Sequence, residues 1–314
     1  MYTVVEGIEQ DIDSWMELVR SVRWNFPGLE TENALEEHKN TVLKFMRQKS
    51  AICVKDEKRI IGVLLFSLKH NMICCLAVSD AYRKQGIASK LLGYALEKLD
   101  RTQPITVSTF REEDEKGIAP RALYKKFGFI PDALIEEFGY PNQRFILYPN
   151  CKVINIYGDN YSGFTSHCRE ASRAIIVKDG NIMLSNETKI GQWMIPGGGI
   201  EAYETPMECC IREVAEETGL IVKIENCFLV MYEYYEDWKF VSYYFECITT
   251  GLTERKPTQR ELQVGAIPEW VVINTAKDIF SHHQDYAELD EERRGIYLRE
   301  YKALTEFLSI KNDK

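Results

Sequence analysis

The chain has 314 residues, 45% of them hydrophobic and 28% charged, so it is long enough for two domains and too apolar to be intrinsically disordered. Its apolar runs, such as Ile60–Phe66, are far shorter than the roughly 20 residues of a transmembrane helix, and its first residues are acidic where a signal peptide is basic. With 39 Lys and Arg against 48 Asp and Glu, the net charge is −9, which disfavours non-specific nucleic-acid binding because such binding depends on cations that neutralise phosphates.

The first half of the chain alternates helical and strand patterns. Apolar periodicity predicts helices over Ile12–Val22, Thr31–Arg47, Gly86–Leu99 and Ala119–Phe127. Apolar runs bounded by polar turns predict strands over Ala51–Lys55, Ile60–Lys69, Met72–Val78, Ile105–Phe110 and Arg144–Tyr148. This alternation predicts an α/β domain over residues 1–149, with a mixed sheet and flanking helices.

The pattern changes at Pro149, where turn-forming residues replace periodic ones. The stretch to about residue 170 is predicted to be a linker or the entry strand of a second domain, residues 150–314. Strands are then predicted over Ser172–Lys178, Ile182–Ser185, Val222–Tyr235, Phe240–Thr249 and Trp270–Ile273, with helices over Thr205–Thr218 and Glu291–Leu308. The second half is therefore also predicted to be an α/β sheet with flanking helices.

Three glutamates in the predicted helix over Thr205–Thr218 suggest a metal site. Glu213, Glu216 and Glu217 stand at i, i+3 and i+4, so they share one helix face. Like charges at this spacing destabilise a helix unless a cation lies among them. Hard oxygen ligands select Mg²⁺ or Mn²⁺ rather than Zn²⁺, so the pattern favours one of these two cations.

Residues beside the glutamates fit the same site. The Arg212 guanidinium could hold a neighbouring carboxylate, such as that of Glu204, in a fixed rotamer. Upstream, Gly197 and Gly198 allow backbone carbonyls or amides to face a metal or a phosphate. From Gly198 to Leu220 the sequence GGIEAYETPMECCIREVAEETGL matches G-x5-E-x7-R-E-U-x-E-E-x-G-U, where U is aliphatic. At every fixed position this pattern resembles the Nudix box, and the resemblance implies an α/β/α sandwich.

The Nudix resemblance implies hydrolysis of a nucleoside diphosphate linked to another group, with Mg²⁺ or Mn²⁺ as cofactor. It assigns the metal to the three glutamates, with a carbonyl of Gly197 or Gly198 as a further ligand. Arg212 and Glu204 join the catalytic set on the same grounds. In the implied mechanism, the metal polarises a phosphoryl oxygen and activates a water that attacks in line.

Two points stay open within this half. We favour Glu213 as the general base, and Glu261, in the loop before Trp270, is the alternative. The box does not name the substrate. The aromatic residues of 232–238 could stack a base, or they could face the core of the sheet, and we favour the core.

A second motif runs from Leu76 to Leu92, where a strand leads through a cationic turn into a helix. The first amides of a helix are unpaired and carry the positive end of its dipole. With Arg83 and Lys84 beside them, these amides form a receptor for a pyrophosphate. Small residues at Gly86 and Ala88 let phosphates approach the backbone.

This second motif closely resembles motif A of GNAT-type N-acetyltransferases, which bind acetyl-CoA there. The resemblance implies acetyl-CoA as co-substrate, bound by Leu76, Val78, Arg83, Lys84, Gln85, Gly86, Ile87 and Ala88. It also implies that the strand at about Cys74–Val78 splays from its neighbour and pairs with the pantetheine arm. Downstream, the segment from Ala119 to Phe129 matches the family's second motif and places Tyr124 as the acid that protonates the leaving CoA thiolate.

One feature departs from many relatives of this family. They carry a glutamate on the motif A strand that deprotonates the acceptor amine, whereas Met72–Val78 has no carboxylate. Glu112, Glu113 and Asp114 are candidates for that base, although such a charge run is usually a solvated loop. A water relay would leave no trace in the sequence.

The sequence thus predicts a bifunctional enzyme, an N-acetyltransferase fused to a metal-dependent pyrophosphohydrolase. The alternative is a Nudix hydrolase whose GNAT-type half senses acyl-CoA without catalysis. The expected partners are small molecules, namely a nucleoside diphosphate derivative, an acceptor amine and acetyl-CoA; no nucleic acid or membrane is expected, and a homodimer is left open. Nine cysteines without a C-x-x-C motif or zinc-site spacing indicate reduced thiols in the cytoplasm.

Overall fold

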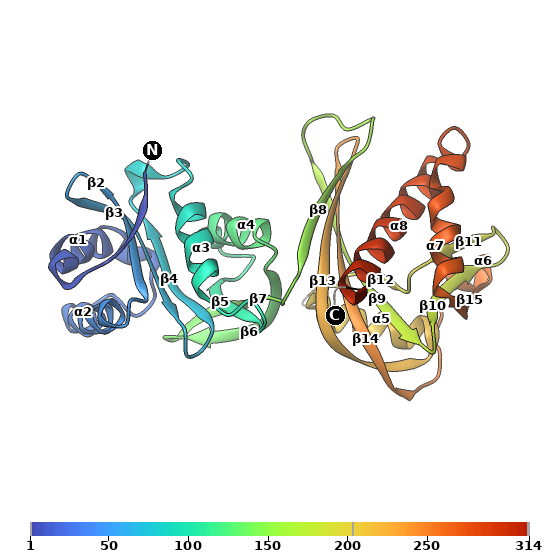
Figure 1. Cartoon of the computed structure of the whole chain (residues 1–314), viewed down its shortest axis with the longest axis horizontal. Coiled ribbons are helices and arrows are strands. Elements are labelled where there is room, and N and C mark those ends of the chain that lie inside the picture. Colours follow the sequence, from blue (N-terminus) through green and yellow to red (C-terminus); the bar gives the residue numbers. More distant parts are fainter. Residues whose placement is uncertain (1, 203, 313–314) are drawn as a thin grey trace. The chain divides into compact units, whose positions relative to one another are not determined.

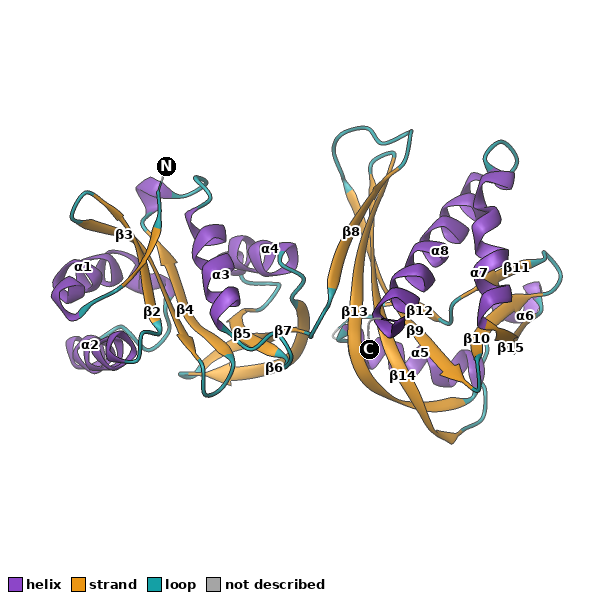
Figure 2. Cartoon of the chain, viewed as in Figure 1, coloured by secondary structure: helices purple, strands orange, loops and turns teal. Residues whose placement is uncertain are grey.

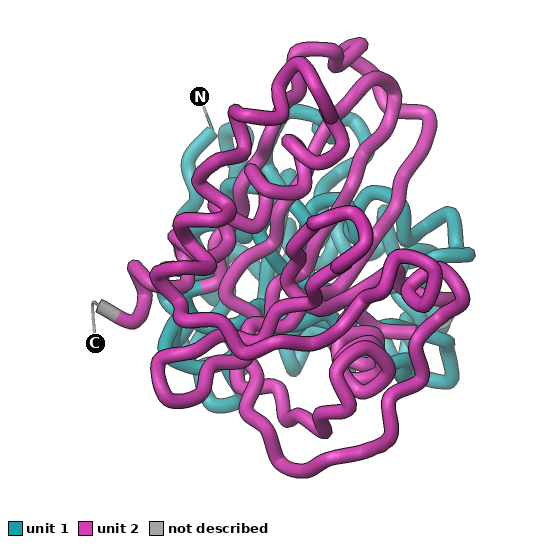
Figure 3. Tube along the Cα trace, turned by 90° about the vertical axis from the view of Figure 1, so that its right-hand side faces the viewer, with its two compact units in different colours: residues 1–150 teal, residues 151–314 magenta. Residues whose placement is uncertain are grey.

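The computed structural model describes residues 2–202 and 204–312. The chain divides into two compact units, Met1–Asn150 and Cys151–Lys314, coloured separately in Figure 3. Each unit has its own sheet and flanking helices, so the α/β class predicted for both halves is confirmed. Among the helices of the described residues, none combines the length and the apolarity needed to cross a membrane.

The first unit is built on a seven-stranded sheet in the order β1-β2-β3-β4-β5-β7-β6. Its strands are β1 (Val4–Glu6), β2 (Ala51–Asp56), β3 (Arg59–Ser67), β4 (Met72–Val78), β5 (Ile105–Phe110), β6 (Ile130–Glu137) and β7 (Tyr140–Leu147). Its helices are α1 (Ile12–Val22), α2 (Glu32–Arg47), α3 (Ile87–Lys98) and α4 (Ile118–Lys126). Helices α1 and α2 lie on one side of the strands, and α3 and α4 on the other (Figure 1).

Apolar side chains fix these layers. Trp15 of α1 and Leu35 of α2 are each 1% exposed, and they pack with Val63 of β3 in one buried cluster. On the opposite face, Gly62 lies directly beneath Ile87 at the start of α3. Burying an apolar side chain of this size contributes about 1.5–3 kcal/mol, so the two faces hold α1 and α3 firmly against β3.

The sheet of the first unit opens between two parallel strands. Strand β4 pairs with β5 only at Met72 and Ile73, although β4 continues to Val78 and β5 to Phe110. On its other edge β4 pairs with β3 up to Val78. The backbone amides and carbonyls on the β5 side of the last five residues of β4 therefore have no partners in β5.

The second unit contains a mixed sheet in the order β11-β10-β9-β14-β13-β8, with β12 beside β9 and β15 beside β10. Its strands are β8 (Lys152–Tyr157), β9 (His167–Lys178), β10 (Asn181–Glu187), β11 (Gln192–Met194), β12 (Gly197–Gly199), β13 (Leu220–Tyr235), β14 (Trp238–Leu252) and β15 (Ala266–Val272). Its helices are α5 (Pro206–Thr218), α6 (Gln259–Val264), α7 (Ile273–Ser281) and α8 (Glu291–Asn312), shown in Figure 2.

Neighbouring residues of β9 show which helix covers which face of this sheet. The Ser172 hydroxyl donates to the carbonyl of Pro206 at the start of α5. The next side chain, that of Arg173, lies 3.6 Å from Glu300 of α8. Because successive side chains of a strand point to opposite faces, α5 and α8 cover opposite faces. The α8 side holds a buried cluster that includes Phe228, Tyr244 and Phe307.

The structure decides one open expectation and corrects others. Of the two alternatives for residues 150 to 170, the entry strand is confirmed, because strand β8 lies there and pairs in parallel with β13. Strand β6 was not expected, because Pro131 and a register shift between Pro131 and Leu134 interrupt its pattern. Helix α6 lies in the predicted polar loop, and helix α7, which was not expected, starts at Ile273, the last residue of the predicted strand. The capping box of Thr258 and Glu261 starts α6 within a polar stretch that lacks apolar periodicity.

Candidate functional sites

Helix α5 is stabilised at both ends by its own sequence. The Thr205 hydroxyl accepts from the Glu208 amide, and the Glu208 carboxylate accepts from the Thr205 amide, which forms a capping box. Pro206 occupies the first turn, and Gly219 ends the helix with φ of 72°, a left-handed conformation that favours glycine. These caps fix the rotation of the helix, so the carboxylates of its inner face point toward β12.

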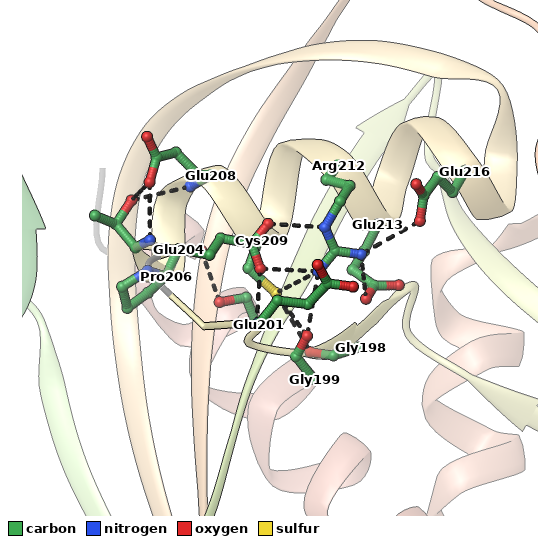
Figure 4. A network of polar contacts seen from close by, with 12 residues as sticks. Gly198, Gly199, Glu201, Glu204, Pro206, Glu208, Cys209, Arg212, Glu213 and Glu216 are labelled. Carbon is green, nitrogen blue, oxygen red and sulfur yellow. Dashed lines mark hydrogen bonds and ion pairs between the residues drawn. The ribbon is translucent and has the colours of Figure 1, made fainter.

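Arg212 of α5 ties the acidic residues together (Figure 4). Its Nε and Nη2 donate to the two carboxylate oxygens of Glu204 over 2.7 and 2.8 Å, the contact that the sequence suggested. Its Nη1 donates to Glu213 over 2.8 Å and to Glu216 over 3.3 Å, and Nη2 also donates to the Gly199 carbonyl over 3.2 Å. The bidentate contact holds the pKa of Glu204 below its ordinary value.

Strand β12 approaches α5 too closely for any side chain at its centre. A Cβ placed on Gly198 would lie 2.4 Å from the Glu213 carboxylate. The Gly197 amide donates to Glu217 Oε2 over 3.1 Å. The glycines therefore bring the backbone of β12 against two of the three glutamates.

Negative charge is concentrated and partly desolvated at this site. Burial, followed by the nearby Glu261 carboxylate, raises the pKa of Glu217 from 4.5 to about 8. Burial also raises the pKa of Glu213, against the opposing effect of Arg212. Glu261, at the start of α6, thus lies close enough to act on both groups. A cation bound among Glu213, Glu217 and Glu261 would offset the repulsion between these carboxylates.

The donor set fits a hard divalent cation by its chemistry. Over residues 2–202 and 204–312, no set of three or more carboxylate, thiol or imidazole side chains is already arranged to hold a metal. Glu213 and Glu216 contact Arg212, and Glu217 contacts the Gly197 amide. The carboxylates nevertheless share a helix face beside glycine carbonyls, and such oxygen donors suit Mg²⁺ or Mn²⁺.

The opened edge of β4 forms the second candidate site. Its residues after Ile73 lack β5 as a partner, and Leu76 and Val78, both predicted to bind the cofactor, are half-buried there. Backbone amides and carbonyls on such an edge need partners. An extended amide-containing ligand can supply them in the manner of an added strand.

The turn after β4 presents exposed backbone and cations. Gly86 caps α3 with φ of 77°, and a Cβ there would meet no atom within 4 Å. Arg83, Lys84 and Gln85 are exposed, and Arg83 pairs with Asp80 over 2.6 Å. An anion could therefore reach the first amides of α3 without obstruction.

Two of the predicted cofactor residues, both in α3, are less exposed than this turn. The Ile87 side chain is 1% exposed and packs in the core, and Ala88 is half-buried. Side-chain contact with a cofactor is thus ruled out for Ile87. The backbone amides at these positions belong to the first turn of the helix, where amides lack intrahelical partners.

Tyr124 of α4 lies in an aromatic environment. Its ring is 5% exposed, with ring centroids 5.7 Å from Phe129 and 6.2 Å from Phe145. Burial, with a smaller effect of the nearby Cys75, raises its pKa well above the ordinary range. The phenol therefore stays protonated at neutral pH, which an acid requires. The packing also shows that Tyr124 supports the core of its unit.

The proposed bases of the first unit differ in their surroundings. Asp114 accepts from the Tyr140 hydroxyl over 2.5 Å and from the Lys116 amide over 2.9 Å, so it stabilises a turn. Glu112 is exposed and lies 3.4 Å from Arg121. Glu113 is exposed as well. None of these contacts favours one carboxylate as the base.

A group of charged side chains on the α8 face of the second unit was not predicted from the sequence. Arg173, Glu233, Arg299 and Glu300 are buried or nearly buried there, and each lies within ion-pair distance of at least one oppositely charged member of the group. They come from β9, β13 and α8, far apart in the chain. The only local indication was a polar residue at an inward position of an apolar strand, as at Arg173 and Glu233.

Comparisons with known proteins find one family model in each unit. A family model described as "NUDIX domain" matches residues 168–292, and one described as "Acetyltransferase (GNAT) domain" matches residues 48–131. Diphosphoinositol polyphosphate phosphohydrolase 3-alpha of Mus musculus is 30% identical over 107 residues, 34% of this chain and 63% of that protein. ADP-ribose pyrophosphatase of Methanocaldococcus jannaschii is 33% identical over 89 residues, 24% of this chain and 53% of that protein.

The chain thus spans less than two thirds of the length of these curated relatives. Among solved structures, a GNAT-family acetyltransferase from Bacillus cereus aligns with 23% identity over 47% of this chain and 96% of that chain, with a TM-score of 0.38. The two family models together account for the motifs of both halves. The chain therefore carries a GNAT acetyltransferase domain in its first unit and a NUDIX domain in its second, as the motif resemblances implied.

Proposed function

We propose that the second unit is a Mg²⁺- or Mn²⁺-dependent hydrolase of a nucleoside diphosphate linked to another group. The observation that carries this proposal is the arrangement of Glu213, Glu216 and Glu217 on one face of α5, with Gly198 packed against Glu213 and Arg212 bonded to its neighbours. A divalent cation bound there polarises a phosphoryl oxygen and makes a water more acidic.

In this proposal each side chain has a defined task. Glu213, Glu216 and Glu217 would hold the cation, with a carbonyl of Gly197 or Gly198. Arg212 fixes Glu204 and Glu213 in position, because one guanidinium contacts both carboxylates. Glu213 would accept the proton of the attacking water, since burial raises its pKa toward the range that suits a base. Glu261 is the alternative base, because its charge acts on Glu213 and Glu217.

A screen of nucleoside diphosphate derivatives with Mg²⁺ or Mn²⁺ tests this proposal, with release of nucleotide or phosphate as the readout. We expect turnover of at least one compound, lost on addition of EDTA and restored by excess metal. Metal-independent turnover, or no turnover across sugar, alcohol and dinucleotide derivatives, would contradict the assignment.

We also propose that the first unit transfers an acetyl group from acetyl-CoA to an amine. The open edge of β4 and the unobstructed start of α3 support binding of the pantetheine arm and of the pyrophosphate. In the transfer, the amine nitrogen attacks the thioester carbonyl, the C–S bond breaks and the thiolate leaves. Tyr124 would give its phenolic proton to that sulfur, because its raised pKa keeps it protonated.

The absence of a carboxylate on Met72–Val78 favours a second candidate for this unit, an acyl-CoA sensor. A base must take a proton from the amine in the transfer, and Asp114 is already engaged with Tyr140. Thermal shift with acetyl-CoA, combined with a free-thiol release assay over a broad amine panel, separates the two. Thiol release with any amine supports the transferase. A thermal shift without release supports the sensor.

Two further expectations belong to this proposal. None of the nine cysteines, all within the described residues, forms a disulfide, which supports a cytoplasmic location. Small molecules are the proposed partners of both units. Size-exclusion chromatography with light scattering would test whether the chain forms a homodimer.

A further inference from the structure

A group of charged side chains lies between the sheet of the second unit and α8. Arg299 donates to Glu300 over 2.8 Å and lies 3.9 Å from Glu233. Arg173 lies 3.6 Å from Glu300, and the Tyr244 hydroxyl donates to Glu300 over 2.9 Å. Glu233 and Glu300 are 3% and 0% exposed. Two cations thus face two carboxylates, and their formal charges cancel.

Several polar atoms of this group have no hydrogen-bond partner among the described residues. They are Arg173 Nε, Glu233 Oε2, Arg299 Nε and the Tyr235 hydroxyl, all buried. A buried polar atom without a partner costs about 1–3 kcal/mol, and such atoms are rare in folded proteins. Several unpaired donors and an unpaired acceptor in one place therefore indicate a ligand that offers both an acceptor and a donor.

The group adjoins the proposed metal site through Arg173. This residue pairs in register with Gly197 of β12, and its Nη1 donates to the Ile195 carbonyl over 3.2 Å. Its charge also lowers the pKa of Glu217, against the stronger effect of burial. Arg173 therefore links this group, on the α8 face of the sheet, to the glycine strand β12 of the proposed metal site.

Flat side chains continue this face of the sheet. Phe240 is the register partner of Glu233 on the neighbouring strand, so both side chains point to the same face. Phe240 stacks on Trp238, with centroids 5.6 Å apart and an interplanar angle of 14°. Trp238 stacks on His167 at 4.7 Å and 17°, and 38% of Trp238 is exposed. The partly exposed Trp238 and the half-buried Phe240 thus place aromatic rings on the same face of the sheet as the unpaired carboxylate oxygen of Glu233.

We propose that Glu233, Arg299 and Arg173 recognise the edge of a nucleobase that stacks against Phe240 and Trp238. This inference rests on the proposed hydrolase function and names its specificity-determining residues. A nucleobase is flat, uncharged and carries adjacent donors and acceptors, which match a carboxylate oxygen and two guanidinium N–H groups. A highly phosphorylated ring would offer only acceptors and negative charge, which Glu233 and Glu300 repel.

Calorimetric titration of the full chain in EDTA tests the proposal without catalysis. The ligands are the four common nucleoside 5′-monophosphates, ribose 5-phosphate and inositol hexakisphosphate. We expect at least one nucleotide to bind about tenfold or more tightly than ribose 5-phosphate. Glu233→Gln should remove that preference or change the ranking of the bases, because the amide replaces an acceptor by a donor, and it should leave ribose 5-phosphate affinity within about twofold.

Glu225→Gln is the matched control, because Glu225 is exposed on the same strand and pairs with Lys223 over 2.7 Å. This variant should bind every ligand with the wild-type affinity. If Glu233→Gln does not fold, Trp238→Ala at the exposed ring takes its place. This variant should weaken the binding of nucleotides but not that of ribose 5-phosphate. Equal binding of ribose 5-phosphate and all nucleotides, tighter binding of inositol hexakisphosphate, or unchanged preferences in the variant would overturn the inference. Base-selective binding without metal-dependent hydrolysis would instead overturn the hydrolase proposal and leave this one standing.

Discussion

The two candidate sites differ in the groups that form them. In the second unit, side chains form the site: Arg212 contacts Glu204, Glu213 and Glu216 in a partly buried network. In the first unit, the backbone forms the site, through the open edge of β4 and the start of α3. A site made of side chains is sensitive to single substitutions, whereas a backbone site tolerates most of them. The predictions below test this difference.

The largest effect is expected at the metal-directed glutamates. Glu216→Gln or Glu217→Gln should lower metal-dependent hydrolysis by about a hundredfold or more, because each removes a charge directed at the cation. Acetyl transfer by the same variants should stay at the wild-type rate, and steady-state assays of both reactions measure this. Hydrolysis at the wild-type rate in both variants would remove these glutamates from the site.

The next largest effect on hydrolysis is expected at Gly198, with the adjacent Gly199 as its control. Gly198→Ala would place a Cβ 2.4 Å from the Glu213 carboxylate, whereas at Gly199 the nearest atom is 3.6 Å away, in the Arg169 side chain. We expect Gly198→Ala to lose about tenfold to a hundredfold in hydrolysis, and Gly199→Ala to remain within about threefold of wild type. Equal losses in the two variants would show that the close approach of Gly198 has no special role.

Tyr124→Phe tests the first unit. Removing the hydroxyl should slow acetyl transfer by about tenfold or more, while acetyl-CoA affinity, measured by calorimetry, should change by less than about twofold because binding uses the backbone. Hydrolysis by the second unit serves as the internal control and should be unaffected. An unchanged transfer rate would mean that another group protonates the thiolate.

The smallest effect is on stability. Because the pKa of Glu217 is raised from 4.5 to about 8 in the folded chain, the folded state holds a proton that the unfolded state releases between these values. Without divalent cations, the stability that this proton provides is present below pH 4.5 and lost as the pH rises to 8. At pH 8 in EDTA, Glu217→Gln should therefore melt a few degrees above wild type, at about 2–4 °C per kcal/mol, and at pH 4.5 the two should coincide. A constant difference across this range would contradict the raised pKa.

Sequence predicted the side-chain site better than the rest of the fold. The glutamates, Arg212 and Gly198 are close in the chain and lie on one helix and its adjoining strand, so spacing alone brings them together. Strand β6 escaped prediction because Pro131 hides its pattern. Strand β8 was predicted only as an alternative to a linker, because it pairs with a distant strand. Register and pairing between distant segments are not written in local periodicity.

The same reason explains why the group on the α8 face was missed. Arg173, Glu233 and Arg299 each stand within apolar or helical stretches, and only the folded sheet brings them together. The opening of β4 was expected from resemblance alone, since the residues of β4 and β5 do not show where their hydrogen bonds stop. Sites composed of non-local contacts thus needed the structure.

The central claim is that the carboxylates of α5 hold a divalent cation. Anomalous diffraction from a crystal soaked in Mn²⁺ tests it most directly. We expect a manganese peak within ligand distance of carboxylate oxygens of Glu213, Glu216 or Glu217, with Arg212 still bonded to Glu204. No manganese peak beside α5, with the Arg212 contacts to Glu213 and Glu216 intact, would contradict it.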